Sequence, residues 1–375
     1  MATTRQALVN DTSVAVMLYM ALELSASKWR IALADGKRAG SQHTVSAGDK
    51  EALLRVIDKA KQRCGMSGAV RVMSCYEAGR DGFWLHRWLL EQGVENVVVD
   101  SSSIEVNRRA RRAKTDGLDA AKLYEMLVRF AGGDKRVWRV LRVPSVEQED
   151  ARRVHRELER LKRERNAHAN RISSLAVLHN VRLERVGGRG WSERLAQLKG
   201  QLPGALWAEI ERESAREKLV RAQILALEKS RQEQLKAMPE GPLLALLKLR
   251  GIGLQSAWVL THELFGWRRF DNRRQLAGCV GFNPSPYDSG ESQREQGISK
   301  AGNRRCRTLL VELAWYWLRY QPNSALSAWF KRRFAAGGKR MRRIGIVALA
   351  RRLLIALWRY VEHGVIPDAA QLKRP

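Results

Sequence analysis

Four carboxylates stand at positions that suit phosphoryl-transfer chemistry. Glu23 lies inside the apolar segment Met20–Leu24, and Glu77 follows a strand-like segment. Asp116 and Asp119 are three residues apart, so they share one face of a helix. Like charges so placed repel one another, and a divalent cation between them removes that conflict. Two such cations can clamp the attacking and leaving oxygens of an in-line displacement at phosphorus.

Each acid also has a plainer interpretation. Asp116 would stabilise the positive N-terminus of its helix. Glu77 would lie in a solvated turn, and Glu23 would lie at a sheet edge. As a set the acids favour a metal site, because each falls where the predicted fold needs it.

The segments around these acids predict an α/β domain. Strand-like and helix-like patterns follow one another in the order three strands, helix, strand, helix, strand, helix. This order suits a mixed sheet of the ribonuclease-H-like kind, in which the first strand, the fourth strand and the last helix converge at one end. The predicted strands are 14–24, 29–34, 43–46, 69–75 and 94–99, and the predicted helices are 50–63, 83–92 and 116–130.

A second candidate site centres on Ser289, which precedes Gly290 in a glycine-rich loop from Gly278 to Gly302. Serine is a weak nucleophile and needs activation. Nearby cations would neutralise a bound phosphate and stabilise a pentacoordinate state, and no His–Asp pair of the protease type lies close in the sequence. The alternatives are an ordinary turn and a nucleophile at Ser285 or Ser292. The cations are Arg294, Lys300, Arg304 and Arg305.

The charge balance points to a nucleic-acid partner. The chain has 68 Lys and Arg residues against 39 Asp and Glu, a net charge of +29, which attracts polyanions. Gly251 and Gly253 resemble the hairpin of a helix–hairpin–helix, where backbone amides approach a phosphate; a simple turn is the alternative. Trp329, beside a second basic run, is a candidate for stacking on a base. The densest basic run precedes Asp116 and comprises Arg108, Arg109, Arg111, Arg112 and Lys114.

The rest of the chain is predicted to be helical. Residues 145–183 and 207–238 carry apolar stripes and many charges, which predicts either a coiled-coil hairpin that acts as a dimerisation arm or a plain helical linker. Residues 242–366 are helical again and more aromatic. We therefore expect three parts: an α/β domain over 1–144, a coiled-coil helical region over 145–240 and a mostly helical domain over 241–375.

The sequence gives no indication of a membrane or of an oxidising compartment. The longest apolar run, Val14–Leu22, is too short to span a bilayer. The four cysteines are widely spaced and match neither a zinc site nor a disulfide framework. A cytoplasmic protein is expected.

These motifs together resemble the transposases of the insertion-sequence one-ten/eleven-eleven family over nearly the whole chain. The matching pieces are Tyr76–Ala78, Lys114–Ala120, Gly281–Pro284, Ser289–Gly290 and Ile298–Asn303. The chain departs from the family pattern at the first acid, where Glu23 stands in place of an aspartate. A glutamate reaches one methylene further but still binds Mg²⁺.

The resemblance implies a fold and a mechanism. It implies a RuvC-like domain whose metal ligands are Glu23, Glu77, Asp116 and Asp119 with Mg²⁺ (or Mn²⁺), a coiled coil, and a C-terminal transposase domain whose Ser289 forms a covalent phosphoserine–DNA link. It also implies a homo-oligomer, dimer or tetramer, in which one subunit's acids meet another's serine. A noncoding guide (bridge) RNA would pair with donor and target DNA, and the protein would be associated with the nucleoid.

Three other functions fit the same residues. One is a site-specific DNA invertase of this architecture, and another is a RuvC-like junction endonuclease without a covalent step. The third is a catalytically inactive nucleic-acid-binding protein.

Overall fold

The computed structural model describes residues 17–67, 70–104, 116–238, 240–289 and 292–373, with the backbone alone described for 102, 116–118, 285–289 and 292–296. The chain forms two compact units, Met1–Val143 and Pro144–Pro375. The further boundary expected at residue 240 stays a prediction.

The first unit is built on a five-stranded mixed sheet. The strand order is β3-β2-β1-β4-β5, in which β1–β2 and β2–β3 pair antiparallel and β1–β4 and β4–β5 pair parallel. The predicted mixed α/β fold is thereby confirmed. The predicted end of the fourth strand at Cys75 was two residues too early, because β4 runs to Glu77. The strands are β1 (Met17–Leu24), β2 (Lys28–Ala34), β3 (Ser41–Ser46), β4 (Arg71–Glu77) and β5 (Val94–Val99).

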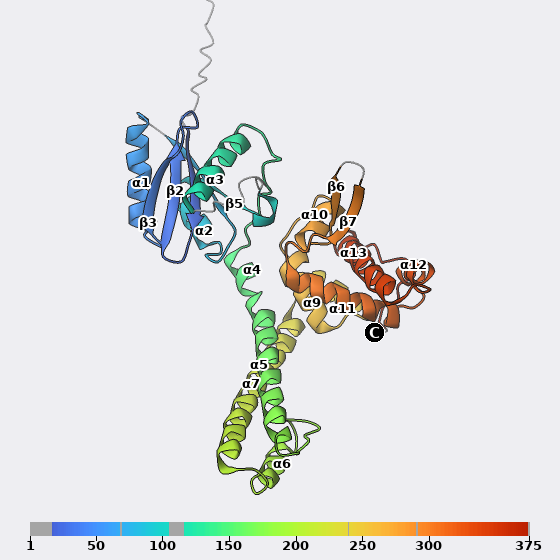
Figure 1. Cartoon of the computed structure of the whole chain (residues 1–375). Helices are drawn as coiled ribbons and strands as arrows, with labels where there is room; N and C mark the ends of the chain where they lie inside the picture. The colour runs from blue at the N-terminus through green and yellow to red at the C-terminus, as the bar shows by residue number, and fades with distance from the viewer. Residues whose placement is uncertain (1–16, 68–69, 105–115, 239, 290–291, 374–375) are drawn as a thin grey trace, which may run out of the picture. The chain divides into compact units, whose positions relative to one another are not determined.

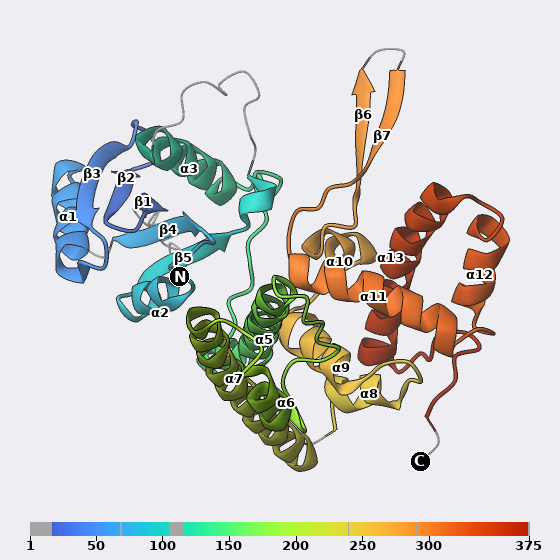
Figure 2. The same cartoon turned by 60° about the horizontal axis from the view of Figure 1, so that its bottom comes forward.

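Helices cover both faces of this sheet (Figures 1 and 2). Helices α1 (Lys50–Arg63) and α2 (Trp84–Glu91) pack on the face that carries Leu18, Met20 and Leu22. Helix α3 (Asp116–Ala131) packs on the opposite face, whose small side chains include Ala21, Ala32 and Cys75. Strand residues alternate between faces, so the small residues of one face let α3 lie close to the strands. A short 3₁₀ turn, η1 (Ser101–Ser103), follows β5.

The second unit begins with an antiparallel helix pair. Helix α4 (Val146–Asp150) starts at a capping box, α5 (Arg153–Val177) packs against α7 (Gly204–Ala237), and α6 (Trp191–Leu198) lies between them in the sequence. Leu158 and Leu161 of α5 pack on Val220 and Ile224 of α7. Ion pairs follow the antiparallel direction: Lys162–Glu228 at 2.7 Å and then Arg171–Glu209 at 2.6 Å. The predicted apolar stripes are confirmed, whereas supercoiling and dimerisation stay predictions.

The remaining helices share one hydrophobic core. Leu353, Leu354 and Leu357 of the longest of them are fully buried in it, as are Leu310 and Leu313. The elements are α8 (Pro242–Lys248), α9 (Leu254–Leu260), a π-helical turn η3 (Thr261–Phe265), α10 (Arg273–Cys279), α11 (Arg304–Tyr320), α12 (Ala325–Phe334) and α13 (Lys339–His363).

The segment Gly278–Gly302, expected to be a loop, contains a β-hairpin. Strands β6 (Pro284–Ser289) and β7 (Ser292–Ile298) pair antiparallel, and Figure 2 shows them standing out from α10 and α11. The prediction of a loop was wrong because Pro284, Pro286 and the polar residues between them carry no strand-like alternation. An irregular register between the two prolines accommodates their missing amide donors.

No helix in the part of the chain that the structure describes is long and apolar enough to cross a membrane. The four cysteines form no disulfide with one another within the described residues.

We expect Leu161→Ala, which truncates a 1% exposed side chain between α5 and α7, to lower the free energy of unfolding by about 2–5 kcal/mol. Urea unfolding followed by far-UV circular dichroism measures this loss. Leu219→Ala on α7, where the side chain is 61% exposed, is the matched control and should change stability by less than about 0.5 kcal/mol. Equal losses in the two variants would contradict the packing described for the helix pair.

Candidate functional site

Glu23 and Glu77 occupy corresponding positions on neighbouring parallel strands. Leu22 of β1 pairs with Tyr76 of β4, so each glutamate is the next residue toward the carboxyl end of its strand. The two-residue period of a strand places Glu23 on the face of Ala21, and Glu77 on the face of Cys75. Both of those residues contribute to the core beneath α3. The two predicted acids therefore lie side by side along the sheet, on the face that α3 covers.

Helix α3 runs antiparallel to β1. Near its C-terminal end, Val128 lies by Gly36, which also backs onto the Tyr19 ring at the start of β1. Nearer its N-terminus, the carbonyl of Leu123 accepts a weak hydrogen bond from Cys75 Sγ at 3.8 Å, and Cys75 pairs with Ala21 in the middle of β1.

This direction turns the N-terminal end of α3 toward the carboxyl ends of β1 and β4. Asp119 lies one helical turn before Leu123, toward the N-terminus of α3. Glu23 lies two residues after Ala21, so both positions are displaced by a similar length in the same direction. Asp119 is half-buried. The meeting of the four acids at one end of the sheet stays a prediction.

These acids do not by themselves form a complete set of metal ligands. Among the described side chains, no three His, Cys, Asp or Glu residues gather closely enough to hold a metal ion. The side chain of Asp116 is not described, and the basic run Arg108, Arg109, Arg111, Arg112 and Lys114 lies outside the described residues. Carboxylate oxygens are the donors that Mg²⁺ prefers, so the chemistry of the donors fits. The magnesium site stays a prediction.

A fifth acid at this sheet edge was missed from the sequence. Asp100 follows β5 directly, and Val99 before it pairs with Glu77. The amide of Asp100 donates to the Arg139 carbonyl at 2.9 Å, and its carboxylate lies 3.5 Å from the Arg139 guanidinium. The available signal was an acid immediately after a β-branched run, because the carboxyl ends of parallel strands meet at one edge.

Ser289 is the last residue of β6 and pairs with Ser292 of β7. Tyr287 pairs with Arg294, so the strand period places residues 289 and 294 on the same face of the two-stranded ribbon. Residue 285 lies at the irregular part of the register, nearer the base of the hairpin. By register, Ser289 and Arg294 are thus placed together, whereas Ser285 is further along the ribbon.

Two glycines bring the two ends of this hairpin segment together. Gly281 (φ +74°) and Gly302 (φ +84°) adopt left-handed conformations. A Cβ atom on Gly281 would lie 2.1 Å from the Ala301 carbonyl oxygen, and one on Gly302 would lie 2.3 Å from that of Cys279. Only glycine allows this close approach of backbones. Exposed Lys300 and Arg304 lie on either side of Gly302 in the sequence and form no ion pair within the described residues.

A buried carboxylate holds the start of α11 in place. Glu263 lies on the π-helical turn and is 1% exposed. Its carboxylate accepts hydrogen bonds from His155 Nε2 at 2.8 Å and from Nε and Nη2 of Arg156 at 2.8 and 3.0 Å. Asn303 Nδ2 donates to it at 3.1 Å, while Asn303 Oδ1 caps α11 by accepting from the Cys306 amide. The Glu263 network therefore joins α5 to the sequence that follows the hairpin.

Electrostatics keep Glu263 ionised in this network. Burial alone would raise the pKa of Glu263, but hydrogen bonds from His155 and Arg156 outweigh it and hold that pKa well below its usual range. Arg305 also contacts Glu263 at 3.5 Å and pairs with Glu159. The charge of Arg305, expected to bind nucleic acid, is thus already engaged inside the protein, unlike that of Arg304.

The predicted phosphate-binding hairpin between α8 and α9 contacts the C-terminal segment. Gly251 has φ +91° and packs on Tyr320, as a tight hairpin requires. The Arg250 amide donates to the Gln371 carbonyl at 3.0 Å, and Lys373 Nζ donates to the Ile252 carbonyl at 2.8 Å. Arg250 therefore does not offer its amide to a phosphate here. Gly253, the second predicted contact, is the residue before α9.

Comparison with known proteins agrees with this arrangement of motifs. The sequence model described as "Transposase IS116/IS110/IS902 family" matches residues 244–328, a range that contains the hairpin and Glu263. A protein of Sinorhizobium fredii named "Putative transposase y4rJ" is 42% identical over 379 residues, which cover 96% of this chain and 95% of that protein.

More distant relatives carry similar names. "Probable family 20 transposase" of Pseudomonas aeruginosa is 30% identical over 59% of this chain and 65% of its own length. "Transposase for insertion sequence element IS1111A" of Coxiella burnetii is 26% identical over 70% of each chain. The similarity along nearly the full length makes this chain a member of a transposase family. The family is the one described as IS116/IS110/IS902.

We expect Glu263→Gln to lower the free energy of unfolding at neutral pH by about 1–3 kcal/mol, because it removes a buried charge that accepts hydrogen bonds from buried His155 and from the partly exposed Arg156 guanidinium. Urea unfolding measures the loss. Glu233→Gln, on an exposed part of α7, is the control and should change stability little.

The pH dependence has a definite sign. A folded pKa below the ordinary value of 4.5 means that the Glu263 contribution is present above pH 4.5 and is lost as the pH falls below it. The wild-type chain should therefore lose more stability than Glu263→Gln on acidification. Parallel acid unfolding curves for the two proteins would contradict this assignment.

Proposed function

We propose that this protein is a DNA transposase of an insertion sequence, a site-specific recombinase that cuts and rejoins DNA through a covalent phosphoserine intermediate. The observation that carries the proposal is the placement of Glu23 and Glu77 on adjacent strand ends, beneath the helix that begins with Asp116 and Asp119. Membership of the transposase family supports DNA as the substrate. The strand order β3-β2-β1-β4-β5 supports a ribonuclease-H-like (RuvC-like) domain.

The four acids would hold Mg²⁺ or Mn²⁺. When bound, the cation would supply charge neutralisation for the oxygens around the reacting phosphorus. Glu23, Glu77, Asp116 and Asp119 would orient the scissile phosphate through it. Asp100 lies at the same sheet edge and is the additional candidate ligand.

Ser289 would supply the nucleophile. Its hydroxyl oxygen forms a bond to the scissile phosphorus while the bond from phosphorus to one deoxyribose oxygen breaks. The serine proton passes to a base, and the released deoxyribose oxygen gains a proton and leaves as a hydroxyl. Attack by another strand's hydroxyl reverses these changes, so one phosphodiester replaces another. Arg294, on the same ribbon face by register, would neutralise the phosphate.

The proposal extends to the assembly that the family resemblance implies. A homo-oligomer would let the acids of one subunit serve the serine of another, and the helix pair α5–α7 offers a dimerisation arm. A noncoding guide RNA would pair with donor and target DNA. The net charge of +29 suits binding of both polyanions.

A DNA invertase of this architecture would use the same chemistry. The genomic context distinguishes the two functions, because ends of an insertion element on both sides of the gene favour transposition over inversion. A junction endonuclease would cleave without any protein–DNA adduct. A non-catalytic binding protein would make no product at all.

We expect the wild-type chain, incubated with Mg²⁺ and DNA carrying its element ends, to form a protein–DNA adduct that survives denaturing electrophoresis. Ser289→Ala should remove the adduct, because loss of a nucleophile lowers turnover by roughly 10⁴–10⁶-fold. Ser285→Ala and Ser292→Ala are the matched controls and should keep it. An adduct that persists in Ser289→Ala would move the nucleophile elsewhere, and strand cleavage without any adduct would favour the junction endonuclease.

We expect Asp119→Asn to weaken Mg²⁺ binding, measured by titration calorimetry, and to abolish the adduct, because it removes one anionic ligand near Glu23 and Glu77. Glu125→Gln is the control on the same helix, since Glu125 is exposed on α3. Identical Mg²⁺ titrations for Asp119→Asn and the wild type would refute the proposed metal site, whatever the adduct assay shows.

A further inference from the structure

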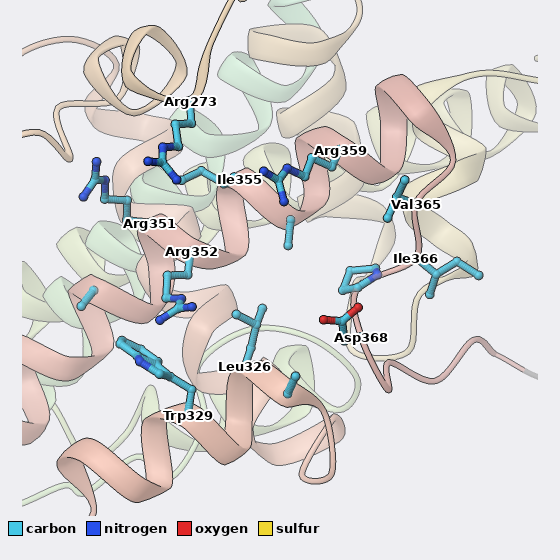
Figure 3. Close-up of a pocket in the computed structure, with 14 residues that line it drawn as sticks. Arg273, Leu326, Trp329, Arg351, Arg352, Ile355, Arg359, Val365, Ile366 and Asp368 are labelled. Carbon is cyan, nitrogen blue, oxygen red and sulfur yellow. The ribbon is translucent and has the colours of Figure 1, made fainter.

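A basic hollow lies between α12, α13 and the segment after α13 (Figure 3). Its volume is about 650 Å³, within the range of small-molecule sites and large enough for one nucleotide. Helix α13 contributes one wall, α12 contributes Leu326 and Trp329, and the C-terminal segment contributes Val365 to Asp368. The hollow lies in the second unit, apart from the Ser289 hairpin in the sequence, and Trp329 is its one residue that the sequence predicted to bind nucleic acid.

The wall from α13 combines arginines with small residues. Arg352, Ile355 and Arg359 follow one another at steps of three and four, so they lie on one face of the helix. Ala348 and Ala356 on the same wall leave room between the long side chains. The sequence did not reveal the site because the pattern of α13 does not show which residues of α10, α12 and the C-terminal segment lie beside its arginines.

Four arginines line the hollow, and none of them has a carboxylate partner among the described residues. Arg273, Arg351, Arg352 and Arg359 form no ion pair within the part of the chain that the structure describes. The Nε–H of Arg351 is buried and has no hydrogen-bond acceptor among the described residues. A buried donor without a partner costs free energy, and a bound anion would recover that cost.

Arg352 and Trp329 form a flat surface inside the hollow. The Arg352 guanidinium lies 4.3 Å from the centre of the Trp329 ring, as in a cation–π pair. The ring face that was expected to stack on a base is therefore occupied by Arg352. Its planar guanidinium offers an outer surface on which a base can stack.

We infer that this hollow binds one nucleotide of a single-stranded nucleic acid, with its phosphate held by the arginines and its base beside Arg352. Guanidinium groups match phosphate oxygens in charge and geometry. Asp368, the one acid of the lining, lies away from Arg273 and Arg351 in Figure 3, so the phosphate is placed at the arginine end. The nucleosides of an intact duplex are stacked and paired and do not enter such a hollow without flipping.

This site is independent of the proposed catalysis. Binding needs neither the acids near Glu23 nor the hydroxyl of Ser289, so it is measured in EDTA, where no cleavage occurs. Failure of the binding test would leave the covalent-adduct test unaffected, and the reverse also holds.

The test measures fluorescence anisotropy of labelled oligothymidylate, oligouridylate and a DNA duplex of equal length with the full chain. We expect Arg352→Gln/Arg359→Gln to weaken single-strand binding about tenfold or more, because each charge-assisted hydrogen bond that is removed is worth at least a factor of about ten. The slope of log K against log salt should fall by about 0.7 for each phosphate that the variant no longer neutralises.

The matched control is Arg212→Gln/Lys218→Gln, which removes the same charge from exposed positions of α7. Both double variants should keep the wild-type circular dichroism spectrum and melting temperature, since all four side chains are exposed. A selective loss of binding in the hollow variant supports the site, and the two single-stranded probes show whether DNA or RNA is preferred. Equal loss in both variants, no loss in either, or a loss confined to the duplex overturns it.

Discussion

The ion network around Glu263 is the constraint on which the second unit depends. A carboxylate with 1% exposure is tolerated only because His155, Arg156 and Asn303 all donate to it. These donors come from α5 and from the turn before α11, so burial of one charge fixes how the helix pair meets the helical core. The π-helical turn that carries Glu263 is the kind of irregularity that often accompanies functional positions.

The Glu263 network positions the root of the hairpin β6–β7. Its base is closed by the backbone contacts of Gly281 and Gly302, one residue before Asn303. Ser289 therefore lies on a two-stranded ribbon whose root is tied to buried charge.

The chain has fewer acidic than basic residues, and this difference explains why some arginines and lysines have no ion-pair partner among the described residues. With 39 acidic residues against 68 basic ones, many carboxylates of the second unit are used in internal pairs such as Arg171–Glu209 and Lys162–Glu228. The arginines of α13 have no such partners in the described structure. Charge that folding leaves unpaired is available to phosphates, and the basic hollow and exposed Lys300 and Arg304 hold such charge.

The sequence by itself determined the order of strands and helices in the first unit and singled out the acids as candidates, because the period of apolar residues and the motif around Asp116 are local properties of the chain. It missed the hairpin, Asp100 and the arginines of α13. Only the tertiary structure decided that Val99, the residue before Asp100, pairs with Glu77, that Arg305 is engaged with Glu263 and Glu159, and that Arg273 joins Arg359 around one hollow. These are contacts between residues distant along the chain, whose energies no local pattern encodes.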